Sequence, residues 1–472
     1  MLSTHIASQI YSNFTFVPTI GQKFLIEKLS EFVSEPASDR ILIVNGYAGT
    51  GKTSVIAALV RTLKQYKINT VLLAPTGRAA KVMALSAGAN AFTIHKKIYR
   101  QQSLTTDVAR FSLDYNKENG AVFIVDEGSM LSNGGGESSI FGSGRLLDDL
   151  ITYVQSGTGC KLIIVGDNAQ LPPVGLDYSP ALDAGAMSVY GTAEGVTLNE
   201  VMRQSQDSGI LFNATLVRCM IEENIIDVPM FRTSFPDVKV LNGGEFLEEL
   251  ADAYDRYGMD NTIVITRSNK RANKFNEGIR RHVLFREEEI SSGDMLMVVK
   301  NNYHFAGKDK EAEMDFIANG DIAQLVKIKR FDEEFGFRFA DAVLRFPDYN
   351  DTELDCKILL DTLQSEAPSL TSQQQTDLFF RVAEDYAEIT TKRKRYQAIR
   401  EDPYYNAVQV KFAYSVTCHK AQGGQWGCVF VDRMLFGEEE MSRDLLRWLY
   451  TAITRATHKV FFVNFDERFF EE

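Results

Sequence analysis

The segment GYAGTGKT, residues 46–53, constrains the fold of this 472-residue chain more than any other. It matches the pattern G-x-x-x-x-G-K-[ST] and stands between the apolar run ILIVN and the helix-forming run SVIAALVRTL. Glycines at these spacings let backbone N–H groups wrap around phosphate oxygens at the start of a helix. The pattern therefore predicts a phosphate-binding loop between a strand and a helix, and so an α/β domain. The flanking strand and helix argue against a chance glycine-rich turn.

The side chains of this loop have distinct expected roles. Lys52 brings a positive charge to the terminal phosphates of a nucleotide, and Thr53 offers a hydroxyl to Mg²⁺. The backbone N–H groups expected to hold the phosphates belong to Gly46, Ala48, Gly49, Thr50, Gly51, Lys52 and Thr53. We therefore expect ATP and Mg²⁺ as cofactors.

Short apolar runs with helical segments between them recur in two parts of the chain. Near-continuous Val, Ile and Leu is typical of parallel strands that are covered by helices on both faces. The first set of runs lies at 41–46, 70–76, 121–127 and 161–167, and the second at 262–269, 410–417, 428–432 and 459–465. The two sets predict two α/β domains.

The stretch between the second-domain strands differs in character. Short alternating runs separated by turn residues indicate antiparallel strands, and a polar helical segment with the basic run Lys392–Arg395 follows them. We read it as a small barrel inserted in the second domain. The expected domains are residues 1–195, residues 196–295 with 411–472, and the insertion at 296–410.

The net charge of −12 and the pI near 5.2 argue, at first sight, against a nucleic-acid partner. The acidic residues, however, gather at 287–289, 438–440 and 471–472, away from the phosphate loop. Lys420 and Arg455 stand in two other segments, VTCHKAQG and LYTAITRATHK. Because a strand in a groove responds to the local field, the overall charge permits DNA binding confined to one channel.

The five cysteines are scattered and form no CxxC pair, which indicates a reducing compartment and no structural zinc. The N-terminus lacks the features of a signal peptide, and no run of about eighteen apolar residues occurs. We therefore expect a cytoplasmic protein that does not act at a membrane.

Polar residues follow two further strands of the first domain. Asp126 and Glu127 end one strand, and Asp167 and Gln170 follow another, so all of them are expected at the carboxyl edge of the sheet. Asp126 is expected to hold Mg²⁺ through water, Glu127 to orient or deprotonate the attacking water, and Gln170 to sense the terminal phosphate. The alternatives are a helix N-cap for the acidic pair and an ordinary polar loop for Gln170.

The second domain offers cations that can reach a phosphate across a cleft. Arg203 stands in LNEVMRQ and Arg455 in YTAITRATHK. The planar guanidinium donates two hydrogen bonds to developing phosphate charge. A surface salt bridge is the alternative for either arginine.

The motifs form an ordered set. They are GYAGTGKT, LLAPTGRAAK, AFTIH, IVDEGSM, VGDNAQLPPVG, LNEVMRQ, ITRSNKRANKFNEGIR, NGDIAQLV, YSVTCHKAQGGQWGCVFVD and LYTAITRATHKV. From about residue 21 to 463 the chain resembles the superfamily 1 helicases of the 5′-to-3′ branch, which contains RecD-like, Dda-like and Pif-like DNA helicases. The resemblance implies two RecA-like domains that hydrolyse ATP in the cleft between them, step 5′ to 3′ along single-stranded DNA and unwind duplex.

The resemblance also assigns roles to individual residues. Gln22 would read adenine, with an exposed helix residue as the alternative, and Gly423 would contact the nucleotide. Single-strand contacts would come from Pro75, Thr76, Thr93, His95, Asn269, Thr417, His419, Lys420 and Gln422. For His95 and His419, the alternative to a DNA contact is a structural role in the folded protein.

Two segments match features of these helicases by position. Residues 96–120 fall where the family carries a duplex-splitting pin, and Tyr99, Phe111 and Tyr115 are candidates to stack on a base. An ordinary hairpin is the alternative. The insertion at 296–410 corresponds to the family's SH3-like subdomain, and the Gly-rich segment 132–144 is longer than the family pattern leads us to expect.

Three other functions remain open from the sequence. The first alternative is a DNA- and ATP-binding subunit of a recombination or exonuclease complex, and the second is a small-molecule kinase. The third is a nuclease whose site would consist of Pro347, Asp348, Asp355 and Lys357. A second α/β domain with two candidate arginines disfavours the kinase. The family default is a monomer acting on single strands and duplex junctions, with repair or recombination proteins as partners.

Overall fold

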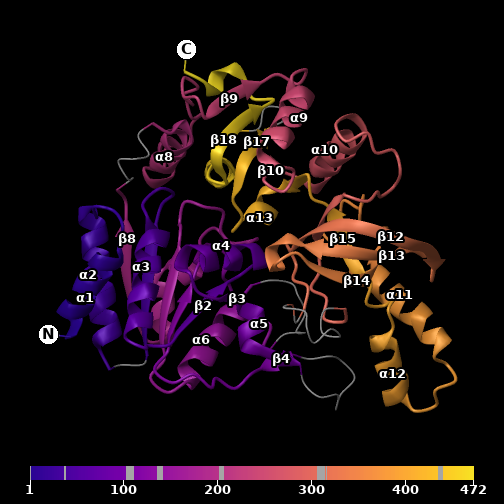
Figure 1. The fold of residues 1–472 in the computed structure, drawn as a ribbon, viewed down its shortest axis with the longest axis horizontal. Coiled ribbons are helices and arrows are strands. Elements are labelled where there is room, and N and C mark those ends of the chain that lie inside the picture. The colour runs from indigo at the N-terminus through magenta and orange to yellow at the C-terminus, as the bar shows by residue number, and fades with distance from the viewer. Residues whose placement is uncertain are drawn as a thin grey trace.

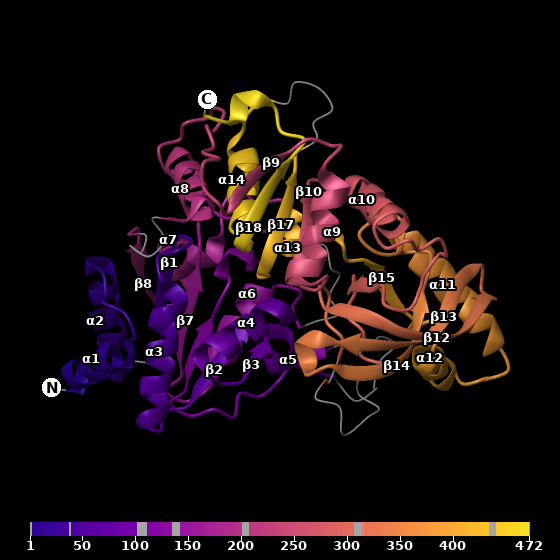
Figure 2. The same ribbon diagram turned by 45° about the horizontal axis from the view of Figure 1, so that its top comes forward.

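The computed structural model describes residues 2–36, 39–101, 111–134, 142–200, 207–305, 314, 316–433 and 440–471. Three bodies are visible in Figure 1: a first α/β domain in indigo and purple, a second α/β domain at the top, and an orange barrel at the right. Figure 2 shows the barrel beside both α/β domains. Within the described residues, no helix is long and apolar enough to cross a membrane.

The first domain is built on a six-stranded sheet with the order β3-β2-β6-β7-β1-β8, in which every neighbouring pair is parallel. Its strands are β1 (Arg40–Gly46), β2 (Thr70–Ala74), β3 (Ala91–Thr93), β6 (Val122–Val125), β7 (Lys161–Gly166) and β8 (Thr192–Leu198). Its helices are α1 (Leu2–Asn13), α2 (Ile20–Ser34), α3 (Lys52–Gln65), α4 (Gly77–Ala87), α5 (Ile94–Ile98), α6 (Leu146–Ser156) and α7 (Ala184–Met187).

Alternate residues of its central strands enter opposite cores. Leu42 and Val44 of β1 pack with α1, α2 and α3 on one face. Ile41 and Ile43 pack with α6 on the other face. Because both faces are covered, the strands are apolar throughout, which explains the continuous runs in the sequence.

The second domain is a five-stranded parallel sheet with the order β16-β10-β17-β18-β9. Its strands are β9 (Val238–Leu241), β10 (Thr262–Thr266), β16 (Ser415–Thr417), β17 (Trp426–Asp432) and β18 (Ala456–Val463). Its helices are α8 (Gly209–Glu222), α9 (Phe246–Tyr257), α10 (Asn269–His282), α13 (Cys418–Ala421) and α14 (Arg443–Ile453). The predicted pair of helix-covered parallel sheets is confirmed.

The insertion is a closed barrel, as predicted. It consists of β11 (Met295–Val298), β12 (Ile322–Glu334), β13 (Phe337–Phe346), β14 (Thr352–Leu359) and β15 (Val408–Phe412). The pairs are antiparallel except for β14 with β15. Helices α11 (Ser372–Asp385) and α12 (Lys392–Glu401) lie in the connection before β15, and α12 carries the basic run.

The observed elements differ from the expected limits at three points. Strand β8 crosses residue 195, and β11 and β15 cross the limits at 296 and 410. The single strand expected at 410–417 is two strands, because β15 completes the barrel and β16 joins the second sheet. The apolar run continues through the turn between them because Ala413 and Tyr414 are buried there.

One buried carboxylate fastens the barrel to the second domain. Asp294, directly before β11, accepts hydrogen bonds from Arg280 Nε at 3.1 Å, Arg286 Nη1 at 2.6 Å and the Tyr414 hydroxyl at 2.8 Å. Arg280 belongs to α10, and Tyr414 lies where the chain leaves the barrel. The cluster therefore holds both chain crossings between the two bodies.

Asp294→Asn is expected to lower the free energy of unfolding of the second domain by about 3 kcal/mol, because it leaves two largely buried guanidinium groups without their counter-charge. Urea unfolding followed by tryptophan fluorescence measures this, since the two tryptophans, Trp426 and Trp448, both lie in the second domain. The matched control is Asp355→Asn, whose carboxylate is 71% exposed in its pair with Lys329 and is worth about 1 kcal/mol at most. Equal losses for the two variants would contradict the fastening role.

Candidate functional site

The phosphate-binding loop joins β1 to α3, as the sequence predicts. Gly49 and Gly51 have φ values of 75° and 79°, a region that favours glycine. A Cβ added at Gly46 would lie 2.8 Å from Lys52 Cγ, so this position has no room for a side chain. The Thr50 hydroxyl donates to the Tyr47 carbonyl at 2.7 Å and fixes the turn.

Lys52 begins α3 and folds back over the loop. Its ammonium donates to the carbonyl of Gly46 and, at 3.0 Å, to that of Tyr47. These carbonyls hold the positive charge at the loop itself, where phosphate oxygens are expected.

Gln22 is fully buried, so the alternative of an exposed helix residue is wrong. Its Oε1 accepts the N–H of Thr19 at 3.0 Å in a capping box at the start of α2. Its Nε2 donates to the Thr50 carbonyl at 2.8 Å. Gln22 thus braces the phosphate loop from α2, and a role toward adenine stays a prediction.

Asp126 and Glu127 follow β6 at the carboxyl edge of the sheet. Thr53 and Asp126 line the same small cavity between the strands and helices α3 and α4, so the two expected magnesium ligands lie together. A hydroxyl and a carboxylate suit Mg²⁺, which prefers oxygen ligands and keeps several waters. Among the described residues there is no cluster of three His, Cys, Asp or Glu side chains placed for a metal.

Glu127 has an unusual backbone. Its φ of 53° places it in the left-handed region, and its N–H donates to Asp126 Oδ1 at 2.9 Å. Such a conformation in a residue other than glycine costs roughly 1–3 kcal/mol and is common at functional sites. Burial raises the pKa of both carboxyl groups, and for Glu127 the nearby Arg455 opposes this shift.

The loop after β7 carries Asp167 and Gln170, and both side chains are buried. Asp167 Oδ1 accepts the Ala169 N–H at 2.9 Å and shapes the loop. Gln170 Oε1 is buried and has no hydrogen-bond partner within the described part of the chain. Buried polar atoms without a partner are rare and call for a ligand or a water.

Arg455 reaches this edge from the second domain. Its Nη1 lies 3.7 Å from Glu127 Oε1, and its Nε donates to the Thr451 carbonyl at 3.1 Å. Only 4% of the residue is exposed, so the alternative of a surface salt bridge is wrong for Arg455. Arg203, the other candidate arginine, lies outside the described residues.

Sequence reasoning missed residues of α14 that also contact the first domain, among them Tyr450 and Thr451. The Tyr450 hydroxyl donates to Asp167 Oδ2 at 2.6 Å and accepts the Ala48 N–H at 2.8 Å. Burial and the charge of Asp167 raise the pKa of Tyr450 well above its usual value, so its proton stays on the hydroxyl. The Thr451 hydroxyl accepts the Leu171 N–H at 2.9 Å. Both residues lie in the segment LYTAITRA, just before Arg455, and this position could have predicted that they face the first domain.

The predicted DNA contacts of the first domain lie at two neighbouring strand ends. Pro75 and Thr76 follow β2, whereas Thr93 ends β3 and His95 follows it in α5. The hydroxyls of Thr76 and Thr93 cap α4 and α5, each accepting an N–H at 3.2 Å. Burial lowers the pKa of His95 to about 4, so its imidazole is neutral.

The predicted DNA contacts of the second domain gather around β16 and α13. Thr417 ends β16, and His419 and Lys420 lie in α13. Burial, with a smaller effect of Lys411, lowers the pKa of Lys420 to about 8. Lys420 Nζ is buried without a hydrogen-bond partner among the described residues, which fits a site for an anion. Burial also lowers the pKa of His419.

Three other predicted residues have specific partners. Asn269 begins α10 and donates to the Glu366 carbonyl at 3.1 Å. Gln422 is buried and donates to the Leu171 carbonyl of the first domain at 2.7 Å, so it contacts the loop after β7. A Cβ added at Gly423 would lie 3.2 Å from Thr76 Oγ1 and 3.7 Å from Glu127 Cγ. Gly423 therefore lies at the junction of the two domains.

The segment expected to form a pin contains a two-stranded hairpin of β4 (Tyr99–Gln101) and β5 (Phe111–Leu113), and residues 102–110 lie outside the described residues. Tyr99 is buried and donates to Asp149 at 2.7 Å. Phe111 is buried and its ring centroid lies 4.4 Å from that of Tyr303. The expectation that these two rings stack on a base is therefore wrong, and Tyr115, 70% exposed, is the one that can.

The barrel contacts the first domain at the start of α4. A Cβ added at Gly77 would lie 2.4 Å from Asp321 Oδ1 and 2.5 Å from the Tyr349 hydroxyl. The Tyr349 hydroxyl lies 3.1 Å from each carboxylate oxygen of Asp321. Lys81 Nζ lies 3.0 Å from Asp348 Oδ1. The barrel thus rests directly beside the Pro75–Thr76 segment.

The residues of the nuclease pattern do not converge. Asp348 pairs with Lys81, and Asp355 pairs with Lys329 on the surface. Lys357 lies between Asp332, at 2.8 Å, and Asp341, at 2.7 Å. Two separate ion pairs and a third cluster leave no shared metal site, so the pattern is a chance match.

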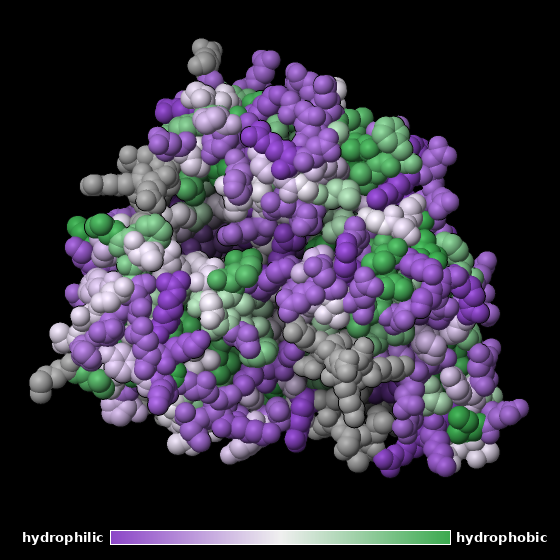
Figure 3. Space-filling view, in the orientation of Figure 1, coloured by the Kyte–Doolittle hydropathy of each residue, from purple (hydrophilic) through white to green (hydrophobic). Residues whose placement is uncertain are grey.

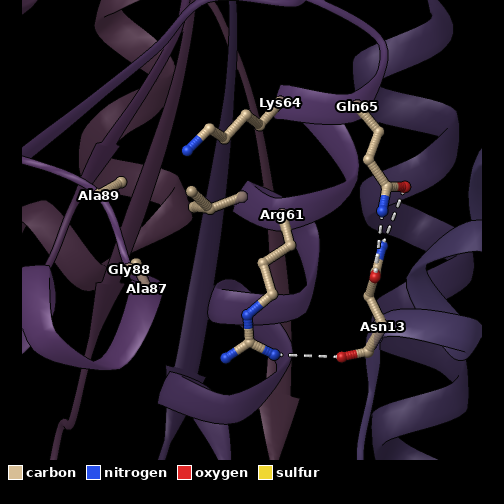
Figure 4. Close-up of a pocket in the computed structure, with 8 residues that line it drawn as sticks. Asn13, Arg61, Lys64, Gln65, Ala87, Gly88 and Ala89 are labelled. Atoms are coloured by element: carbon tan, nitrogen blue, oxygen red, sulfur yellow. Dashed lines mark hydrogen bonds between the residues drawn. The ribbon is translucent and has the colours of Figure 1, made fainter.

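A recess and a separate cavity are visible on the surface of the protein. Figure 3 shows the recess, lined largely by hydrophilic residues, between the first domain and the second domain above it. The cavity, of about 520 Å³, lies away from this recess, between the last turns of α3 and α4. It is lined by Arg61 and Lys64, and Figure 4 shows Arg61 bonded to the Asn13 carbonyl. Because Lys52 and Lys64 are at opposite ends of α3, about 18 Å apart along its axis, this cavity is separate from the phosphate loop.

Comparison with known proteins agrees with this geometry. Residues 30–218 match a family model described as an AAA domain, and residues 412–463 match one described as the UvrD-like helicase C-terminal domain. The second match covers α13, β17, α14 and β18, and it includes Tyr450 and Arg455. The chain belongs to the superfamily 1 DNA helicases. The predicted branch, with its RecD-like, Dda-like and Pif-like members, is confirmed.

Three similar proteins support this assignment. The helicase is 24% identical to ATP-dependent DNA helicase dda of Enterobacteria phage T4, over 94% of this chain and 99% of dda. It is 27% identical to ATP-dependent RecD2 DNA helicase of Deinococcus radiodurans, over 41% of this chain and only 24% of RecD2. A crystal structure of Pif1 helicase from Bacteroides with ADP-AlF3 and single-stranded DNA shares the fold, with a TM-score of 0.50 and 14% identity over 97% of this chain and 95% of that one.

The contact between the barrel and α4 is expected to make the stability of this helicase depend on pH. Burial raises the pKa of Asp321 to about 7. The folded state therefore holds this proton more tightly than the unfolded chain, in which the pKa is about 3.9. The contribution of Asp321 to the free energy of unfolding falls as pH rises from about 3.9, the pKa in the unfolded chain, to about 7, the pKa in the folded protein. Above pH 7 this contribution no longer changes with pH.

Asp321→Asn should remove this dependence, because an amide does not titrate. The measurement is the free energy of urea unfolding of both proteins at several pH values from 5 to 8. Relative to the variant, the wild type should lose stability from pH 5 to about 7. A constant difference, or one that grows in favour of the wild type, would contradict the assignment.

Proposed function

We propose that this protein is an ATP-driven motor that moves 5′ to 3′ along single-stranded DNA and unwinds duplex. The observation that supports it best is Arg455 of the second domain lying 3.7 Å from Glu127 of the first, on the sheet edge that also carries the phosphate loop. A catalytic set divided between two bodies depends on their relative position. Hydrolysis and domain movement are therefore coupled.

The residues divide the chemistry among them. ATP supplies the phosphate bond that is broken, and Mg²⁺ would neutralise charge on the phosphate oxygens. Lys52 and the loop N–H groups would bind the phosphates, and Thr53 and Asp126 would hold the metal. Glu127 would accept the proton of the attacking water, and a pKa raised by burial makes it a better base. The buried Oε1 of Gln170 would accept a hydrogen bond from that water, and Arg455 would stabilise charge on the transferred group.

The DNA path would follow the other strand ends. Thr76, Thr93 and Thr417 present short polar groups at the carboxyl edges of both sheets, and Lys420 adds a buried cation. Such contacts grip phosphates and do not read sequence. Few cations line this path, so affinity should be modest, with a log–log salt slope of about 0.7 per phosphate neutralised.

The direction of movement is tested with duplexes that carry a single-stranded tail on either the 5′ or the 3′ side. With ATP and Mg²⁺, the purified protein is expected to unwind the 5′-tailed substrate and to leave the 3′-tailed one intact, as measured by strand separation in a gel. Unwinding of the 3′-tailed substrate alone would contradict the direction. ATP hydrolysis without unwinding would favour a DNA-binding subunit that needs partners.

Lys52→Ala is the control for the nucleotide site. It is expected to abolish both hydrolysis and unwinding, because it removes the cation at the phosphate loop. Wild-type turnover in this variant would show that the site lies elsewhere.

Arg455→Lys keeps the charge but removes the planar fork. DNA-stimulated hydrolysis is expected to fall on the order of a thousandfold, while nucleotide binding changes little. Steady-state hydrolysis and binding of a fluorescent nucleotide measure the two effects separately. Arg468→Lys, at an exposed arginine near the C-terminus, is the matched control and should behave as the wild type.

A further inference from the structure

We infer that Arg78 is a positioning residue that couples DNA binding on the first domain to Arg455 of the second, by stacking on Trp426. It sets how strongly single-stranded DNA stimulates ATP hydrolysis. The inference rests on the proposed function. It goes beyond that function by naming the side-chain contact that links the DNA path to the ATP site.

Arg78 lies in the first turn of α4, two residues after the predicted DNA contact Thr76. Thr76 is the N-cap of this helix, and its hydroxyl accepts the Ala79 N–H at 3.2 Å. Thr76 and Arg78 therefore belong to one hydrogen-bonded turn. A shift of this turn toward a bound strand moves the guanidinium of Arg78 with it.

The Arg78 side chain reaches from the first domain to the second. Its guanidinium carbon lies 4.1 Å from the centre of the Trp426 ring, and its Nη2 donates to the Gln425 carbonyl at 3.0 Å. Trp426 is only 3% exposed, and removal from water strengthens the attraction between a cation and an indole face. A Cβ added at Gly424 would lie 2.4 Å from Trp426 Cη2 and 3.2 Å from Arg78 Cδ, so the two side chains fill the space beside this glycine.

Trp426 is in turn bonded to Arg455, the proposed catalytic arginine. The Trp426 N–H donates to the Arg455 carbonyl at 2.9 Å, and Arg455 Nη1 donates to the Gly424 carbonyl at 3.3 Å. The same Nη1 lies 3.7 Å from Glu127 Oε1. The segment that Arg78 contacts is therefore the segment that holds Arg455 beside Glu127.

An arginine fits this role better than a lysine would. An ammonium is sufficient to contact a phosphate, whereas stacking on an indole needs the flat guanidinium. Packed side chains carry coupling between two sites when they have two arrangements. The stack joins two domains whose relative position changes in the proposed motor, so it has the two arrangements that coupling requires.

The test measures ATP hydrolysis at saturating ATP, with and without saturating oligothymidylate, and the affinity for that oligonucleotide by fluorescence anisotropy. Arg78→Lys keeps the charge and a donor for the Gln425 carbonyl but removes the flat guanidinium, and Arg78→Ala removes all three. Arg61→Lys is the matched control at the other end of α4. Arg61 donates to the carbonyls of Asn13, at 3.2 Å, and Ser86, at 3.3 Å, both in the first domain.

Both Arg78 variants are expected to lower the stimulation of hydrolysis by DNA roughly two- to thirtyfold, because the stack on Trp426 is lost. Arg78→Lys should bind oligothymidylate about as tightly as the wild type, because its charge remains. The loss should therefore lie in the rate at saturating DNA and not in the affinity. Arg61→Lys should be stimulated as the wild type is.

Wild-type stimulation in Arg78→Lys would overturn the inference, and so would an equal loss in Arg61→Lys. Weaker DNA binding by Arg78→Ala that Arg78→Lys restores, with full stimulation at saturating DNA, would reduce Arg78 to a phosphate contact and also overturn it. Circular dichroism of the three variants confirms that they fold.

The proposed function has a separate readout. A wild type that does not hydrolyse ATP refutes the proposed function and this inference with it. Hydrolysis that DNA stimulates without unwinding refutes only the motor activity, and the effect of Arg78→Lys on the stimulation is still measured.

Discussion

The parallel direction of the strands is the constraint on which the rest of the molecule depends. When every strand of a sheet runs the same way, all carboxyl ends meet at one edge. In the first domain this edge collects the phosphate loop after β1, Thr76 after β2, Glu127 after β6 and Gln170 after β7. Residues that are far apart in the sequence therefore lie together in one site, because the direction of the strands alone brings them to the same edge.

Polar contacts join the two α/β domains, beside the apolar packing of Ala169 and Leu171 against the core of the second domain. Tyr450 to Asp167, Thr451 to Leu171, Gln422 to Leu171 and Arg455 to Glu127 are hydrogen bonds or ion pairs. A neutral hydrogen bond contributes only about 1 kcal/mol net, and one to a charged group about 1.5–3 kcal/mol, because water replaces either when the domains part. Arg78 adds a guanidinium 4.1 Å above the Trp426 ring. An interface of this kind can close and open repeatedly, whereas a large apolar interface would remain shut.

The sequence predicted the elements whose physical signal is local. Runs such as ILIVN correctly predicted buried parallel strands. The spacing of the glycines correctly predicted the loop in which Gly49 and Gly51 lie. What it could not provide was the identity of cross-domain partners. No local pattern indicated that Gln422 donates to the Leu171 carbonyl or that Phe111 packs on Tyr303. Both outcomes depend on how separate bodies dock, and no periodicity in one segment encodes that. The split of the 410–417 run into β15 and β16 has the same cause.

The insertion of the barrel has a consequence for how the chain folds during synthesis. The first domain is contiguous and complete once β8 has left the ribosome. In the second sheet, β9 pairs with β18, whose residues lie more than 200 positions later. Strand β10 lies between β16 and β17 in this sheet, and both of those strands also follow the barrel. The second domain must therefore wait for the barrel to be made, and the backbone N–H and C=O groups along both edges of β10 stay unpaired meanwhile. Early folding of the barrel, which pairs Leu296 with Phe412, would shorten that interval by holding the two halves of the domain together.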